Sequence, residues 1–187
     1  MDEDSRSEDN RLIDAYLDGG NESAIEELIV KYRKEVYLTA YRVAGDMEEA
    51  KDITQKALIS AVSELRNFKR KSAFKTWLYR ITVNAALNHT RGNAYKTVEL
   101  CETIQSGERG ADVCLIEKER ARRLKGLLAG LPPRQRLSVI LRVYRGLSLA
   151  ETAAVMECSE GAVKSHYHLA INKLKTAMPA DMQGKDL

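Results

Sequence analysis

Residues 66–91 read RNFKRKSAFKTWLYRITVNAALNHTR. Apolar side chains in this stretch recur at intervals of three and four residues, which is the period of an α-helix with one buried face. They are Phe74, Trp77, Leu78, Ile81 and Ala85. The same stretch holds seven Lys or Arg residues and no Asp or Glu. It therefore predicts a helix that is apolar on one side and lies in a basic environment.

Helical spacing continues over most of the 187 residues, and no segment alternates between apolar and polar as a half-buried strand does. The expected fold class is therefore all-α. Between residues 93 and 112 the periodicity fails, glycines appear and polar residues dominate. We therefore expect two small helical domains, residues 8–92 and 113–178, joined by a flexible linker at 93–112.

Polar residues mark where several helices are expected to begin. Asn21 and Asp46 precede apolar periodic segments, as N-cap residues do. Ser148 is followed three residues later by Glu151, which is the pattern of a capping box. Ser159 predicts the start of a last helix after a tight turn. Two helices in this order predict a helix-turn-helix in the second domain, although a plain helical hairpin has the same pattern.

The basic stretch 66–91 also carries aromatic rings. Cations attract a phosphate backbone, and flat rings offer surfaces on which unpaired bases stack, so the stretch favours contact with single-stranded nucleic acid. The alternative is a solvated basic face with aromatic core residues, and Phe74 is assigned mainly to the core. In the second domain, base edges are expected to meet the outward residues of the last helix, chiefly Lys164, Ser165 and His168.

Several classes of function are disfavoured by composition. The net charge is only +3, but residues 1–10 are acidic while 66–91 are basic, which indicates a localised anionic partner. We expect a cytoplasmic protein without direct membrane insertion, because no long apolar run or signal peptide pattern occurs. Three cysteines without C-x-x-C spacing, and the lack of nucleophile or phosphate-loop motifs, predict no enzyme activity, cofactor, metal site or small-molecule substrate.

Five motifs in register resemble the extracytoplasmic-function group of bacterial RNA polymerase sigma factors. They are DITQ at 52–55, FKTWLYRI at 74–81 with Asn84, LP at 131–132, GLSLAE at 146–151 and GAVKS at 161–165. The resemblance implies a factor that binds core RNA polymerase and directs it to promoter DNA. It assigns polymerase binding to Asp52, Gln55 and Lys56, where the family usually has an acid in place of the lysine.

The resemblance also assigns promoter DNA contacts. It implies that residues of the 67–73 loop and the next helix read and melt the minus-ten element: Asn67, Phe68, Lys69, Arg70, Lys71, Ser72, Lys75, Trp77, Tyr79, Arg80, Asn84 and Asn88. The minus-thirty-five element is assigned to the second domain, through Arg142, Arg145, Ser148, Lys164, Ser165, His166, His168 and Lys173. At positions 166 and 169 the family usually carries Arg, whereas this chain has His and Leu.

Members of this group are often held inactive by an anti-sigma factor, so such a protein is a further expected partner. A stand-alone helix-turn-helix regulator that never contacts polymerase is the principal alternative. A pure protein-interaction module is the second alternative, and neither would open promoter DNA.

Overall fold

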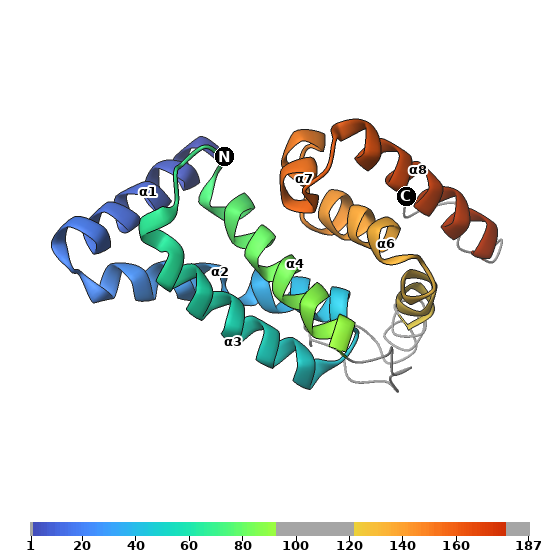
Figure 1. The fold of residues 1–187 in the computed structure, drawn as a ribbon, viewed down its shortest axis with the longest axis horizontal. Helices are drawn as coiled ribbons and strands as arrows, with labels where there is room; N and C mark the ends of the chain where they lie inside the picture. Colours follow the sequence, from blue (N-terminus) through green and yellow to red (C-terminus); the bar gives the residue numbers. More distant parts are fainter. Residues whose placement is uncertain (1, 93–121, 179–187) are drawn as a thin grey trace, which may run out of the picture.

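The computed structural model describes residues 2–92 and 122–178, and Figure 1 shows their arrangement. Within these two ranges the regular structure is helical and no strand occurs, which confirms the all-α prediction there. No helix of the described ranges is long and apolar enough to cross a membrane. The predicted linker, 93–112, lies outside the described residues, and the domain boundaries stay a prediction.

The first helical unit consists of α1 (Asp2–Gly19), α2 (Glu22–Ala44), α3 (Met47–Glu64), the short 3-10 helix η1 (Leu65–Asn67) and α4 (Phe74–Gly92). The N-cap predicted at Asp46 is confirmed, because its side chain accepts a hydrogen bond of 2.8 Å from the Glu49 backbone N–H. The prediction for Asn21 is wrong in detail: it precedes α2, but its side chain makes no capping hydrogen bond.

The second helical unit contains a helical segment at 122–129, followed by α6 (Pro133–Val139), the π-helical turn η2 (Ile140–Tyr144), α7 (Leu149–Met156) and α8 (Glu160–Ala177). The predicted capping box is confirmed, since Ser148 N donates to the Glu151 carboxylate at 2.8 Å and Glu151 N donates to Ser148 Oγ. Ser159 Oγ accepts from Ala162 N and caps α8 as predicted. Together α7 and α8 form the expected helix-turn-helix.

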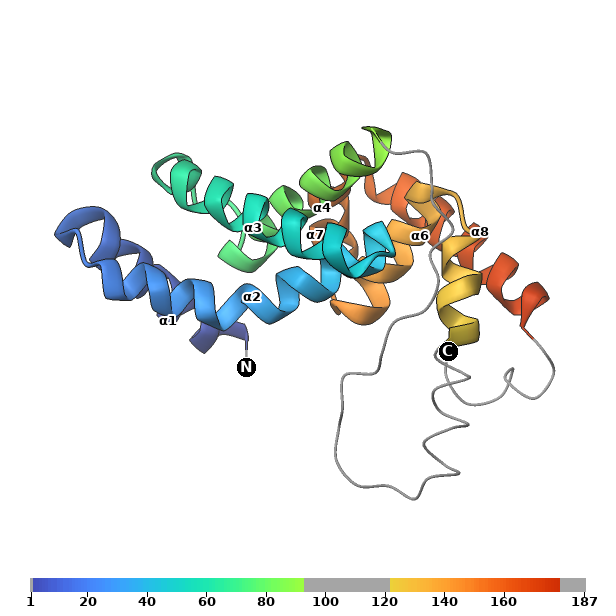
Figure 2. The ribbon, with the colours of Figure 1, turned by 90° about the horizontal axis from the view of Figure 1, so that it is seen from below.

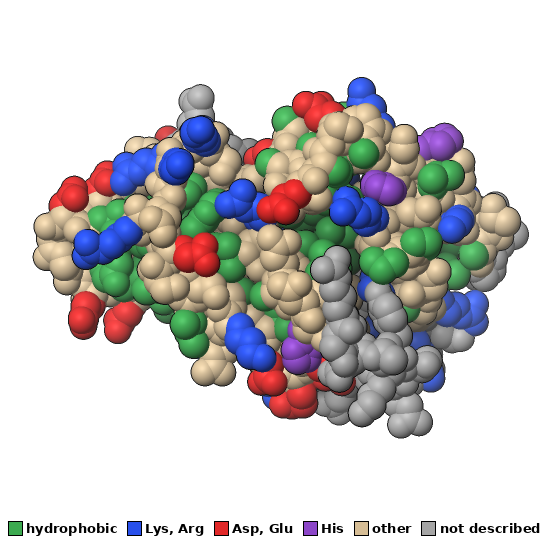
Figure 3. All heavy atoms as spheres, viewed as in Figure 1, with side chains coloured by type: hydrophobic (Ala, Val, Ile, Leu, Met, Phe, Trp, Pro, Cys, Tyr) green, Lys and Arg blue, Asp and Glu red, His purple; other side chains and the backbone are tan. Residues whose placement is uncertain are grey.

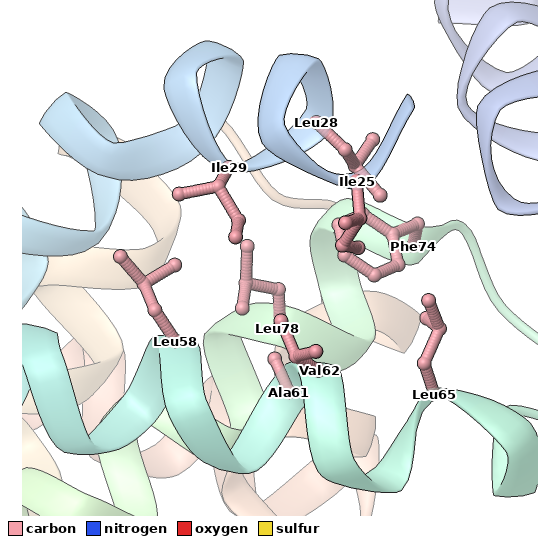
Figure 4. Close-up of a pocket in the computed structure, with 9 residues that line it drawn as sticks. All are labelled: Ile25, Leu28, Ile29, Leu58, Ala61, Val62, Leu65, Phe74 and Leu78. Atoms are coloured by element: carbon pink, nitrogen blue, oxygen red, sulfur yellow. The ribbon is translucent and has the colours of Figure 1, made fainter. Parts of the chain in front are cut away.

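One apolar core holds the first unit together. Figure 4 shows side chains from α2, α3, η1 and α4, which line a small void of about 10 Å³. They are Ile25, Leu28, Ile29, Leu58, Ala61, Val62, Leu65, Phe74 and Leu78. A void of this size with no polar lining gives a water molecule no hydrogen-bond partner, so it is a packing gap rather than a ligand site.

A second core is shared between the two helical units. Tyr79 and Val83 of α4 pack in one buried cluster with Ile140, Leu141 and Val155 of the second unit. The helices that meet are chiefly α4 and α7, with α2 close to η2. Figure 2 shows the second unit seated against the first rather than apart from it. The sequence gives no indication of this arrangement.

Candidate nucleic-acid interface

The loop before α4 begins with a buried aromatic cluster. Phe68, Phe74 and Trp77 lie with their ring centroids 5.0–5.8 Å apart, and Trp77 is only 8% exposed. The helical spacing predicted this burial for Phe74 and placed Trp77 on the same apolar face. The resemblance assigned Phe68 and Trp77 to the base-binding surface, but both are mainly core residues of the first unit, so the loop begins at a rigid aromatic cluster.

The basic residues of the loop extend outward from this aromatic cluster. Lys69, Arg70 and Lys71 are exposed. Arg70 has a left-handed backbone (φ 54°), and its guanidinium binds the carboxylate of Asp14 in α1. This hydrogen bond lowers the pKa of Asp14. Figure 3 shows basic side chains gathered over this end of the first unit.

A polar cavity of about 250 Å³ opens beside the loop. Its lining combines the loop with α4 and with one residue of α7: Asn67, Phe68, Lys69, Arg70, Lys71, Ser72, Thr76, Trp77, Arg80 and Ala154. The cavity is therefore lined by cations, an amide, two hydroxyl side chains and two aromatic side chains. This combination suits a phosphorylated aromatic ligand such as a nucleotide.

An exposed polar stripe runs along α4 away from the cavity. Arg80, Asn84 and Asn88 follow one another at intervals of four residues and are all exposed, while Lys75 is half-buried nearby. Residues four apart lie on one face of a helix, so the three side chains form a continuous row. Because Arg80 also lines the cavity, the row begins where the cavity ends.

Tyr79 is placed differently from its neighbour Arg80. Its side chain is completely buried (0% exposed), its hydroxyl donates to the Glu35 carboxylate, and its ring lies 5.9 Å from the Arg145 guanidinium. Burial and the carboxylate raise the pKa of Tyr79. In this arrangement Tyr79 contacts the second unit and is not part of the exposed row.

The outer face of α8 presents a second polar surface. Lys164, Ser165, His168 and Lys173 are exposed and His166 is half-buried. The His168 Nε2 atom lies 3.0 Å from the Asn172 amide, so these two side chains are oriented together. With the period of an α-helix, Lys164, Ser165 and His168 share one exposed face of α8, whereas His166 and Lys173 lie towards its other side.

Three other residues predicted near the minus-thirty-five element make contacts within the protein. Arg142 donates to the Leu147 carbonyl, which fixes the turn before α7. Arg145 lies against Tyr79, and Ser148 caps α7. In this structure these side chains help hold the helix-turn-helix in place, although Ser148 is exposed and Arg142 and Arg145 are partly exposed.

The residues predicted to bind polymerase lie on the outer face of α3. Asp52, Gln55 and Lys56 are all exposed there. Ile59 continues the same face and is 61% exposed, although sequence reasoning did not select it. Its spacing of three and four residues from Lys56 and Gln55 was the available signal. No cluster of ligands suitable for a metal ion occurs among the residues that the structure describes.

Comparison with known proteins identifies the family. Residues 28–95 match Sigma-70 region 2, and residues 121–174 match Sigma-70, region 4. The chain is 30% identical over 185 residues to the RNA polymerase sigma-H factor of Pseudomonas aeruginosa, covering 93% of this chain and 95% of that protein. The chain belongs to the RNA polymerase sigma factors. The ECF RNA polymerase sigma-E factor of Escherichia coli K12 is 31% identical over 159 residues, which cover 78% of this sigma factor and 82% of that protein.

Solved structures share the fold of this sigma factor. CnrH, in complex with the cytosolic domain of CnrY, matches with a TM-score of 0.67 at 20% identity, covering 91% of this chain and 94% of that chain. The sigma factor RpoE of Bartonella quintana, in complex with the anti-sigma factor NepR, also matches with a TM-score of 0.67, at 21% identity, covering 83% and 97%. Both support the all-α arrangement of two helical units.

Two residues close to the row of α4 were missed by sequence reasoning about this sigma factor. Ala154 lines the cavity, and the Glu151 carboxylate accepts a hydrogen bond from Thr76 in α4 at 3.2 Å. Both belong to α7, some 75 residues further along the chain from Thr76. Nothing in a local pattern places them there, because the contact depends on how the two units pack.

Proposed function

We propose that this sigma factor opens promoter DNA by holding one separated strand on its first unit. The observation that carries the proposal is the continuity of the exposed row Arg80, Asn84 and Asn88 with the cavity beside the basic loop. A strand lying along the row has amide and guanidinium partners, and the cavity is placed to take a base that leaves the stack.

The energetics of base extrusion support this assignment. Taking a base out of the duplex costs a few kcal/mol, and stacking returns about 1–3 kcal/mol per base. Phe68 and Trp77 give the base an apolar wall at the cavity, and the exposed cations Lys69, Arg70 and Lys71 supply phosphate contacts. Because Phe68 and Trp77 also pack in the core, the cavity wall is held rigid before DNA arrives.

The other assigned surfaces complete the proposal. The outer face of α8 reads duplex DNA of the minus-thirty-five element through Lys164, Ser165 and His168, and the outer face of α3 binds core RNA polymerase. The protein acts in the cytoplasm, where polymerase and promoter DNA meet, and phosphodiester synthesis belongs to polymerase. An anti-sigma factor is a further proposed partner, in keeping with the complex formed by the Bartonella quintana sigma factor.

The loop assignment is tested with holoenzyme reconstituted from core polymerase and a variant in which Lys69, Arg70 and Lys71 are all changed to Ala. Using a promoter selected from a random library, we expect loss of permanganate-reactive thymines and a fall of at least about tenfold in run-off transcription. Competition for core polymerase should be unchanged, since the α3 face is intact. Normal strand opening by this variant would falsify the loop assignment.

A control variant tests whether the effect depends on where the cations lie or only on the loss of positive charge. A variant with Ala at Arg33 and Lys34 removes two exposed cations from α2 in the same unit, and it should transcribe normally.

A variant with Ala at Asp52 and Gln55 tests the outer face of α3, and it should lose competition for core polymerase. If it competes as well as the wild type, α3 is not the docking surface.

A further inference from the structure

Leu169 is an exposed apolar residue on α8, the helix assigned to duplex DNA. It is 48% exposed and belongs to none of the three apolar clusters formed by the described residues. Figure 1 shows α8 along the outside of the second unit, where it packs on α6 and α7. Leu169 therefore contributes little to holding the second unit together, and another explanation for a large apolar side chain at this place is needed.

The position of Leu169 around α8 puts it at the edge of the face assigned to DNA. The residues that anchor α8 in the second unit are Val163, Ala170 and Leu174. With about 100° per residue, Leu169 lies about 100° or more around the helix from each anchor, but only about 40° from Ser165. It also lies about 6 Å further along the helix axis than Ser165. Because successive base pairs are about 3.4 Å apart, the two side chains can face base pairs about two steps apart.

Gly161 supports a close approach of this face to another molecule. It is exposed in the first turn of α8, and a Cβ atom there would meet no side chain closer than Ser159 Oγ, at 3.9 Å. Its φ is not positive, so neither packing nor backbone conformation within the protein requires glycine, which destabilises a helix relative to alanine. A larger side chain would fit the protein but would hold a bound duplex further away.

The polar residues of the same face discriminate weakly between bases. The Ser165 hydroxyl donates to the Gly161 carbonyl at 3.1 Å, so it is left mainly with its capacity to accept. Lys164 carries a compact charge on a flexible stem, which binds phosphates as readily as base edges. Selective reading by this face therefore needs a further contribution, and Leu169 is placed to supply it.

A leucine side chain discriminates between base pairs by what it can cover without loss. It donates and accepts no hydrogen bonds, so it gains nothing from phosphates, and it leaves an amino or carbonyl group without a partner where it covers one. In the major groove the C5 methyl of thymine is the apolar group among the base edges. Contact between this methyl and Leu169 removes two apolar surfaces from water. The chemistry of the side chain therefore favours thymine.

We infer that Leu169 is a specificity-determining residue, which selects one thymine of the minus-thirty-five element by contact with its C5 methyl group. The inference rests on the proposed function, because it names a base read by the same face of α8. Uracil is thymine without this methyl and has the same hydrogen-bonding groups. Burial of one methyl group corresponds to a preference for thymine over uracil of about three- to fivefold in affinity.

The test uses holoenzyme reconstituted from core polymerase and a duplex promoter selected from a random library with the wild-type chain. Each thymine of its minus-thirty-five element is replaced in turn by deoxyuridine. We expect one replacement to weaken binding by wild-type holoenzyme about three- to fivefold. With Leu169→Ala the same replacement should leave the affinity nearly unchanged, because the shortened side chain no longer reaches the methyl.

Two controls accompany Leu169→Ala. Val30→Ala is the matched variant, because it truncates an exposed apolar side chain on α2 of the first unit, and it should keep the full effect of methyl removal. Leu169→Ala places a strong helix former at an exposed position, so its thermal unfolding midpoint should equal that of the wild type. A loss of the methyl effect then reports on the contact and not on the fold.

The outcomes separate the inference from the proposed function. If no thymine shows a methyl effect, or if Leu169→Ala shows the same effect as the wild type, the inference is overturned. The proposed function stands in that case provided that Lys164→Ala with Ser165→Ala still weakens binding to the duplex. If this double variant binds as tightly as the wild type and no methyl effect occurs, α8 does not read the element, and the inference fails together with the proposed function.

Discussion

The two proposed DNA-reading surfaces differ in how accessible they are in the free chain. On α8, Lys164, Ser165 and His168 are exposed. On α4, Arg80 and Asn84 are exposed but Thr76 and Tyr79 lie beneath the second unit. A duplex-reading surface is therefore available from the start, whereas the strand-reading surface is only partly available.

This difference has a physical basis in what each surface binds. A duplex exists before polymerase arrives, so a reader of duplex DNA loses nothing by being permanently exposed. Separated strands exist only during initiation, and an exposed basic surface for them would bind other single-stranded nucleic acids through their phosphates. In this structure α7 covers Thr76, which lies one turn before Arg80 on α4.

The largest expected effect is on DNA affinity, when the residues of each surface are replaced in separate variants. Arg80→Ala with Asn84→Ala should weaken binding to the separated strand, while Lys164→Ala with Ser165→Ala should weaken binding to duplex promoter DNA. Each lost base contact is worth about 1–3 kcal/mol, which gives tenfold or more for each pair. Holoenzyme titrations with single-stranded and duplex probes from one selected promoter measure both affinities. If either double variant lowered the affinity for both probes equally, the two surfaces would not bind single-stranded and duplex DNA separately.

Local signals in the sequence predicted the helix-turn-helix well. Ser148, Glu151 and Ser159 each form the capping contact that their spacing predicted, because a cap depends only on residues within one turn. The exposed face of α8 followed from the same local periodicity. The side chain of Asn21 was expected to cap α2 and does not, although a helix begins directly after it.

The burial of Tyr79 was not predictable in this way. Helical periodicity identified one buried stripe on α4, through Phe74, Trp77 and Leu78, which packs within the first unit. Tyr79 and Val83 form a second buried stripe against the second unit, and that stripe depends on residues such as Ile140 that are distant in sequence. A polar tyrosine beside Arg80 therefore resembled part of the exposed row.

The next effect concerns stability and tests whether Tyr79 belongs to the covered side. Tyr79→Phe keeps the ring but removes the hydroxyl that donates to Glu35. Loss of a hydrogen bond to a charged group should lower the free energy of unfolding by about 1.5–3 kcal/mol, measured by urea denaturation. Tyr144→Phe is the matched control, because its ring makes the contact with Arg42, and it should be nearly neutral. Equal stability of the two variants would contradict a buried Tyr79 hydroxyl that donates to Glu35.

The smallest expected effect concerns Asp14, whose carboxylate binds Arg70 in the exposed basic loop. Asp14→Asn removes a negative charge from the basic loop and leaves Arg70 free to bind phosphate, so strand affinity should rise by about twofold at low salt. Arg70 lowers the pKa of Asp14, so the ion pair is present above the usual aspartate range and is lost only as pH falls below it. The ratio of variant to wild-type affinity should therefore stay constant between about pH 8 and pH 5.

Asp18→Asn, on the same helix, is the control, and it should change affinity less because no hydrogen bond joins it to the loop in the described structure. If Asp14→Asn weakens strand binding instead, the carboxylate positions Arg70 for DNA rather than competing with the strand.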